Sequence, residues 1–281
     1  MADLCHTHTT HGQRVVRDEE LRPGGRPVMM RSDQTRTDTC EAHGPFVAHN
    51  RIGNLWTRCP ACGAEDEARR VAARQAEALA RDAVLLEQRI RTSGIPERFK
   101  DRTLGTFTAG SEAQKRALAF ATEYAEGFDS VLESGRSALF VGRVGTGKTH
   151  LAAGIALHII GKNHTVLFTT ALRAVRRVKD TWRRDSDETE AEAVAALVSA
   201  SLLVIDEIGV QFGSDTEKMI LFDALNGRYE RRLPTLLLSN LGVEDVKTCL
   251  GERVFDRLRE DGGQAIVFDW ESHRGQKSPK P

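Results

Sequence analysis

The stretch GRVGTGKT at residues 142–149 decides the fold of this chain, because it matches the phosphate-loop pattern G-x-x-x-x-G-K-[ST]. The apolar run SALFV precedes it and a second apolar run follows, as expected for a buried strand leading into a helix. Lys148 is predicted to reach the β- and γ-phosphates of ATP, and Thr149 to ligate Mg²⁺. The predicted nucleotide contacts come from Gly142, Arg143, Val144, Gly145, Thr146, Gly147, Lys148, Thr149 and His150.

A phosphate loop requires acidic residues at the end of another strand, and LLVIDE at residues 202–207 supplies them. Asp206 is predicted to hold Mg²⁺ together with Thr149, and Glu207 to act as the general base that polarises the attacking water. A later apolar run, TLLLSN, ends at Asn240. An amide at that position can hold the water or sense the γ-phosphate, although an asparagine that merely starts a turn is equally common.

Around these motifs, helical and strand patterns alternate, which predicts an α/β fold with a parallel, doubly wound sheet covered on both faces. The expected strands are 137–142, 165–170, 202–206, 235–240 and a last one in QAIVFDW. The expected helices are 111–126, 149–160, 171–182, 189–200, 217–231 and a short one around GERVFDRLRE.

Upstream of this region, Cys40-x₂-His43 and Cys59-x₂-Cys62 form two close pairs separated by fifteen residues. This spacing is typical of a closed tetrahedral zinc site, and three thiolates with one imidazole leave no open position, so a structural Zn²⁺ is predicted. The alternative is a loop of free thiols.

The chain of 281 residues is predicted to have five parts: a flexible tail (1–39), a zinc-binding module (40–63), a helical linker (64–110), an ATPase domain (111–275) and a short tail (276–281). The residues at the start lack the apolar core of a signal peptide, and no apolar run is long enough to span a membrane. A reducing cytoplasm is therefore expected, which also fits clustered cysteines as metal ligands.

Basic and acidic residues balance at 40 each, so nucleic acid would have to bind at a local basic cluster. The stretch RAVRRVKDTWRR at 173–184 is such a cluster, and a tryptophan within it can stack on a base. The residues predicted to contact single-stranded DNA are Arg173, Arg176, Arg177, Lys179, Trp182 and Arg183. A basic surface helix without a ligand is an equally good interpretation.

The order of phosphate loop, acidic strand end, Asn-ended strand and late arginine helix resembles the AAA+ ATPases. Within that class the chain resembles the DnaC-type replicative helicase loaders over about residues 93–275. The segments that carry this resemblance are TSGIPERF (92–99), GKTHL (147–151), VKDTW (178–182), LLVIDEIGVQ (202–211), GERVFDRLRE (251–260) and FDWESHR (268–274).

The resemblance implies an ATPase that contacts a hexameric DnaB-type helicase, binds single-stranded DNA and helps to place the helicase ring on DNA. It gives Lys148 and Thr149 the Walker A roles, Asp206 and Glu207 the Walker B roles, and Asn240 the sensor 1 role. Arg257 matches the arginine finger and Arg274 the sensor 2 arginine. Because Lys148 and Arg274 serve their own nucleotide, Arg257 is expected to act on a neighbouring subunit, which implies self-association through the ATPase domain. Arg253, one turn earlier, would support it.

The N-terminal half departs from the helicase-binding region of the enterobacterial loaders. Two other functions remain open from the sequence. One is an IstB-type transposition helper ATPase, which shares the GKTHL segment. The other is a nucleotide-gated adaptor with negligible hydrolysis, against which the intact Lys148, Asp206 and Glu207 argue.

Overall fold

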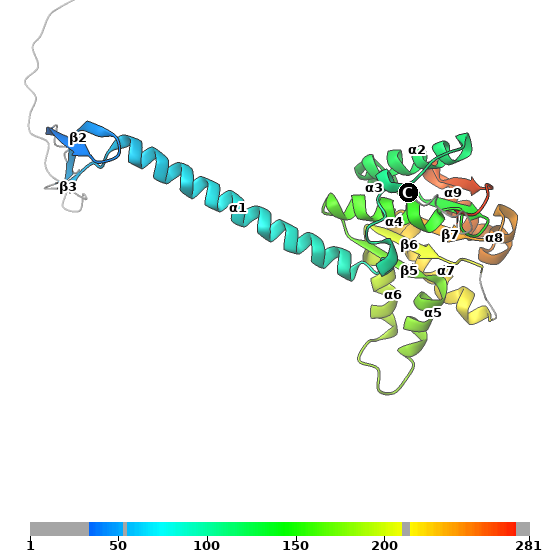
Figure 1. The fold of residues 1–281 in the computed structure, drawn as a ribbon. Helices are drawn as coiled ribbons and strands as arrows, with labels where there is room; N and C mark the ends of the chain where they lie inside the picture. The colour runs from blue at the N-terminus through cyan, green and yellow to red at the C-terminus, as the bar shows by residue number, and fades with distance from the viewer. Residues whose placement is uncertain (1–33, 53–54, 210–213, 274–281) are drawn as a thin grey trace, which may run out of the picture. The chain divides into compact units, whose positions relative to one another are not determined.

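The structure is a computed structural model that describes residues 34–52, 55–209 and 214–273, and these form two compact units divided after Ala76 (Figure 1). Each unit is described by itself. Arg274, the tail at 276–281 and residues 1–33 of the predicted N-terminal tail lie outside the described residues.

The first unit contains a small antiparallel sheet in the order β1-β2-β3, and it ends in the start of helix α1. The elements are β1 (Thr35–Cys40), β2 (Gly44–Ile52), β3 (Leu55–Trp56) and α1 (Pro60–Thr92). The tight turn between β1 and β2 contains His43, and Gly44 follows it with a positive φ of 77°. The sequence placed the start of the metal module at residue 40, whereas the first strand begins at Thr35.

The second unit is built on a five-stranded sheet in the order β5-β6-β7-β4-β8, in which every pair of neighbours is parallel. This confirms the predicted fold class. The strands are β4 (Ala138–Gly142), β5 (Val166–Thr170), β6 (Leu202–Asp206), β7 (Thr235–Ser239) and β8 (Gln264–Phe268). The strand β7 lies between the phosphate-loop strand β4 and the acidic strand β6, so the carboxyl ends of all three meet at one edge of the sheet.

Helices cover both faces of this sheet (Figure 1). One face is covered by α2 (Glu112–Glu126), α3 (Phe128–Ser134) and α4 (Lys148–Gly161). The other is covered by α5 (Ala171–Asp180), α6 (Glu190–Ser199), α7 (Asp215–Glu230), α8 (Val243–Leu250) and α9 (Glu252–Arg259). Alternate strand residues enter the two cores: Ala138 and Phe140 of β4 face α4, whereas Leu139 and Val141 face the second layer. Burial on both faces explains why these strands read as continuous apolar runs.

The segment after α1 contacts the β5 edge of the sheet, where the backbone N–H of Phe168 donates to the Ser93 carbonyl at 2.6 Å. Short 3₁₀ turns follow at Glu97–Phe99 and Leu104–Thr106, within the region predicted as linker. Across the described residues, no helix is both long and apolar enough to cross a membrane.

Candidate functional site

The phosphate loop lies between β4 and α4, and its shape depends on glycines. Gly142 has a φ of 126°, and a Cβ there would come within 2.2 Å of the Phe268 carbonyl oxygen of β8. Gly147 has a φ of 97°, and a Cβ there would meet the Phe107 ring at 2.7 Å. Both positions therefore exclude other residues on steric grounds. Lys148, the first residue of α4, is almost wholly buried.

The Lys148 ammonium donates to loop carbonyls: Nζ lies 2.6 Å from the Gly142 oxygen and 2.7 Å from the Arg143 oxygen. These two carbonyls hold the Lys148 ammonium group against the backbone of the phosphate loop. An incoming phosphate offers stronger, charge-assisted hydrogen bonds, so the ammonium can exchange one set of acceptors for the other.

Asp206, at the carboxyl end of β6, faces Thr149 across the sheet edge. The Thr149 hydroxyl donates to Asp206 Oδ2 at 2.9 Å, and the Glu207 N–H donates to Oδ1 at 2.7 Å. Burial raises the pKa of the Asp206 carboxyl, while these two hydrogen bonds oppose that rise. A hydroxyl and a carboxylate this close are hard oxygen ligands suited to a divalent cation such as Mg²⁺.

Glu207 and Asn240 complete the polar rim of the site. Glu207 has a left-handed backbone (φ 63°) and an exposed side chain, so its carboxylate is open to solvent. Left-handed backbone at a non-glycine residue is strained, and such strain concentrates at functional positions. Asn240 directly follows β7 and is also exposed. Both line a cavity of about 320 Å³ that also contains Lys148 and Thr149.

The site also includes residues that the sequence motifs do not indicate. Arg98 and Phe99, from the first 3₁₀ turn, line the same cavity, with the Arg98 guanidinium 5.2 Å from the Phe99 ring centre. Arg98 lies 50 residues before Lys148 and Phe99 is the next residue, so only the TSGIPERF resemblance indicated their segment.

The C-terminal segment braces the phosphate loop. The Trp270 indole donates to the Thr146 carbonyl at 2.9 Å, and the His273 backbone N–H donates to the Gly145 carbonyl at 3.0 Å. As far as it is described, the FDWESHR stretch therefore supports the phosphate loop without lining the nucleotide cavity.

On the α4 side, His150 Nε2 lies 3.0 Å from the Thr103 carbonyl oxygen. Burial lowers the pKa of His150, so its ring is neutral at pH 7 and donates this hydrogen bond.

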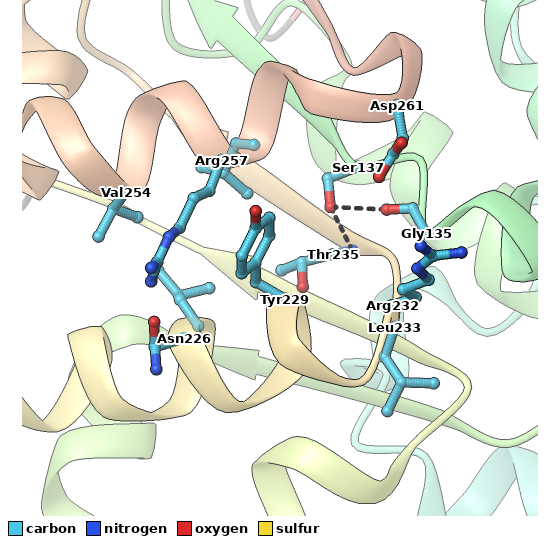
Figure 2. Close-up of a pocket in the computed structure, with 12 residues that line it drawn as sticks. Gly135, Ser137, Asn226, Tyr229, Arg232, Leu233, Thr235, Val254, Arg257 and Asp261 are labelled. Carbon is cyan, nitrogen blue, oxygen red and sulfur yellow. Dashed lines mark hydrogen bonds between the residues drawn. The ribbon is translucent and has the colours of Figure 1, made fainter.

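Arg257 does not line this cavity. Its guanidinium carbon lies 4.6 Å from the centre of the Tyr229 ring, in a small crevice between α7 and α9 (Figure 2). Arg253, on the same helix, is exposed. The predicted arginine finger therefore lies away from the chain's own phosphate loop.

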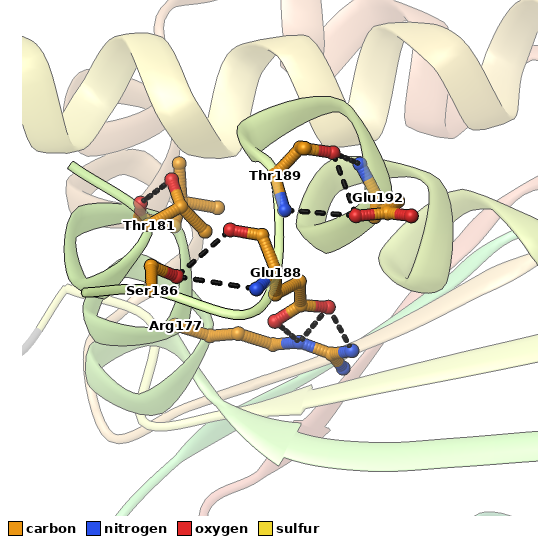
Figure 3. A network of polar contacts seen from close by, with 7 residues as sticks. Arg177, Thr181, Ser186, Glu188, Thr189 and Glu192 are labelled. Carbon is orange, nitrogen blue, oxygen red and sulfur yellow. Dashed lines mark hydrogen bonds and ion pairs between the residues drawn. The ribbon is translucent and has the colours of Figure 1, made fainter. Parts of the chain in front are cut away.

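The predicted DNA-contacting residues divide into two groups. Arg177 donates three hydrogen bonds to the Glu188 carboxylate, Lys179 pairs with Glu217, and the Trp182 indole donates to Glu190 (Figure 3 shows the Arg177 pair). Within the described part of the chain, no hydrogen bond or ion pair engages the exposed guanidinium groups of Arg173, Arg176 and Arg183. Only this second group presents unneutralised charge.

In the first unit, the four predicted metal ligands converge. One donor atom from each of Cys40, His43, Cys59 and Cys62 lies within 4.8 Å of the others. His43 Nδ1 lies 3.3 Å from Cys62 Sγ, and its Nε2 lies 2.9 Å from Glu65 Oε1. The hydrogen bond with His43 lowers the pKa of the Cys40 thiol to about 6, and the same contact raises the pKa of the His43 imidazole to about 9. Three sulfurs and one imidazole, which the Glu65 carboxylate orients, fit a tetrahedral zinc ion.

Comparison with known proteins agrees with this geometry. A family model described as IstB-like ATP binding protein matches residues 71–276. The replicative helicase loader DnaC of Escherichia coli is 34% identical over 198 residues, covering 70% of this chain and 79% of that protein.

Among solved structures, a DnaC helicase loader superposes with a TM-score of 0.55 at 24% identity, covering 61% of this chain and 99% of that one. The AMPPCP-bound DnaA from Aquifex aeolicus gives a TM-score of 0.51 at 20% identity, covering 62% of this chain and 50% of that one. These two likenesses support the fold.

The parallel sheet, the phosphate loop and the opposed Thr149 and Asp206, together with the match to an ATP-binding family, define a P-loop ATPase with the AAA+ fold. More specifically, the chain belongs to the family of IstB-like ATP binding proteins, which the match over residues 71–276 and the similarity to DnaC establish.

Proposed function

We propose that this chain is an ATP-dependent loader of a replicative DNA helicase. The observation that carries the proposal is the 34% identity to a replicative helicase loader along 79% of that protein's length. The nucleotide cavity, with Lys148, Thr149, Asp206, Glu207 and Asn240 around it, supports the ATP-dependent part of the role.

In this proposal, ATP binding draws the Lys148 ammonium from the loop carbonyls to the β- and γ-phosphates. Thr149 and Asp206 hold Mg²⁺, whose charge offsets the cost of burying the Asp206 carboxylate. Glu207 activates the water and Asn240 orients it at the γ-phosphate. Turnover is slow and is stimulated by DNA or by the helicase, because ATP acts here as a switch.

Arg257 acts in trans on the nucleotide of a neighbouring copy, since it lies away from its own cavity. This requires self-association through the second unit. The sensor 2 role proposed for Arg274 falls on a residue outside the described part.

Single-stranded DNA binds along α5 and the segment after it in this proposal, with Arg173, Arg176 and Arg183 as the available phosphate contacts. Zinc, bound by Cys40, His43, Cys59 and Cys62, stabilises the first unit, and the closed ligand set gives it a structural role.

The deciding experiment is co-purification with a hexameric DnaB-type helicase under ATP and under ADP. A loader forms a nucleotide-dependent complex with the helicase. The alternative is an IstB-type transposition helper, because the matching family is described as IstB-like. Such a helper would assemble on duplex DNA and leave the helicase unbound. Turnover of a Glu207→Gln variant then distinguishes either ATPase from a non-hydrolysing adaptor. In an ATPase the change abolishes turnover while ATP still binds. In an adaptor the turnover is already negligible and does not change.

A further inference from the structure

Tyr229, near the end of α7, forms the surface on which Arg257 of α9 rests (Figure 2). The guanidinium carbon is 4.6 Å from the ring centre, well within the range of a cation–π contact. The ring itself is held in place, because the Tyr229 hydroxyl donates to Glu260 Oε2 at 2.7 Å. That hydrogen bond raises the pKa of the phenol, so the hydroxyl keeps its proton at neutral pH. The direction of Arg257 is therefore set by a fixed aromatic face.

No carboxylate neutralises this arginine within the described residues: Arg257 takes part in no ion pair, and its Nη1 is buried without an acceptor. Arg177 shows the opposite arrangement, since the Glu188 carboxylate takes up three of its hydrogen bonds. A guanidinium neutralised in that way must break an ion pair before it can meet a phosphate. A guanidinium held by a ring is oriented without an ion pair to break, and its donors other than the buried Nη1 stay available.

From these contacts we propose that Tyr229 is the positioning residue for Arg257, and that its ring holds the guanidinium ready for the γ-phosphate bound by a neighbouring copy of this chain. The inference rests on the proposed trans role of Arg257. It assigns to α7 a part in hydrolysis by the neighbouring subunit, although Tyr229 itself touches no nucleotide of its own chain.

The test compares Tyr229→Leu, which keeps apolar bulk without the aromatic face, with Tyr229→Phe, which keeps the face. Steady-state turnover of the full-length chain is measured with single-stranded DNA present. Tyr229→Leu is expected to lower kcat by more than about tenfold with KM for ATP unchanged, because the lost interaction forms in the transition state. Tyr229→Phe, which keeps the face but loses the hydrogen bond to Glu260, is expected to lower kcat much less than Tyr229→Leu does.

Two further arms distinguish positioning from damage to the fold. Adding Tyr229→Leu to an Arg257→Ala chain is expected to cause no further loss, because both changes remove one function. Mixing Tyr229→Leu chains with Lys148→Ala chains is expected to restore turnover. In the mixture, a Lys148→Ala chain supplies a correctly positioned Arg257, and the neighbouring Tyr229→Leu chain supplies an intact phosphate loop. A misfolded Tyr229→Leu chain would not be restored in this way.

The outcomes distinguish a failure of the positioning role of Tyr229 from a failure of the trans role of Arg257. If Arg257→Ala turns over normally, the trans role of Arg257 is wrong. If Arg257→Ala is inactive while Tyr229→Leu is active, the trans role stands and the positioning role is overturned. Additive losses in the double variant also overturn it. Arg259→Ala, on the same helix and exposed, is the matched control and is expected to leave kcat unchanged.

Discussion

Arg228 of α7 is wholly buried, which is rare for a charged side chain. Burial lowers its pKa to about 9, so it is still charged at pH 7. No carboxylate balances it within the described residues. Instead, the guanidinium donates to the Thr235 hydroxyl and to backbone carbonyls of Leu197, Val198, Ala200, Ser201 and Pro234. It thereby satisfies the carbonyls at the end of α6 and fastens α6 to the start of β7.

We expect Arg228→Met to be strongly destabilising, because it fills the space but leaves several buried carbonyls without a donor. The free energy of unfolding should fall by about 3 to 5 kcal/mol. Thermal and urea unfolding measure this. The exposed neighbour Arg231 is the control, and its change to methionine should cost less than about 0.5 kcal/mol. Equal stability of the two variants would show that Arg228 does not hold the layers together.

At the scale of one element, α5 and the loop after it form a basic surface that is partly self-neutralised. The buried face of the helix consists of Ala171, Ala174, Val175 and Val178, which leaves its arginines on the outer face. Glu188 reaches back from the loop to Arg177, and both side chains remain partly exposed. Exposed ion pairs add little stability, so this carboxylate can be lost at small cost to the fold.

Glu188→Gln is therefore expected to strengthen binding of single-stranded DNA, because it frees Arg177 for a phosphate. Affinity should rise roughly threefold, and the slope of log K against log salt should steepen by about 0.7. Arg176→Glu should act in the opposite direction. Fluorescence anisotropy over a salt series measures both, with Glu133→Gln on α3 as the control. If neither affinity nor slope moves, α5 is an ordinary basic surface.

The sequence predicted most elements of the second unit to within two residues, because apolar periodicity directly reflects burial on the sheet. It missed α3 and α8, which are only seven and eight residues long. It also missed the strands of the first unit. There the alternating residues of TRTDTC are mostly polar and half-buried at most, so no apolar pattern marks them.

For the site, the sequence predicted the residues whose spacing is local, such as Lys148 and Thr149. Residues that enter the site from elsewhere in the chain, such as Arg98 and Trp270, carry no spacing signal relative to the loop. Ion-pair partners also cannot be predicted from the sequence. Nothing in the sequence pairs Arg177 with Glu188, so the basic cluster appeared more highly charged than the folded surface is.

At the scale of the whole molecule, the two units are stabilised in different ways. The second has two apolar cores, one on each face of its sheet. In the described part of the first unit, the buried hydrophobic residues are only Ala48 and Cys59. The family match begins at residue 71, so the proposed function rests on the second unit. The first unit has too small a core and needs another source of stability.

Because a core of this size cannot offset the entropy of folding, we expect the first unit to require zinc. The purified chain should contain one zinc ion, and Cys62→Ser should lose it and expose residues 34–59 to proteolysis and rapid hydrogen exchange. Nucleotide binding by the second unit should persist. Cys249→Ser, which removes the half-buried thiol of α8 outside the cluster, should keep the metal. A Cys62→Ser chain that retains zinc, or a metal-free chain whose first unit stays protected, would contradict a zinc-dependent fold.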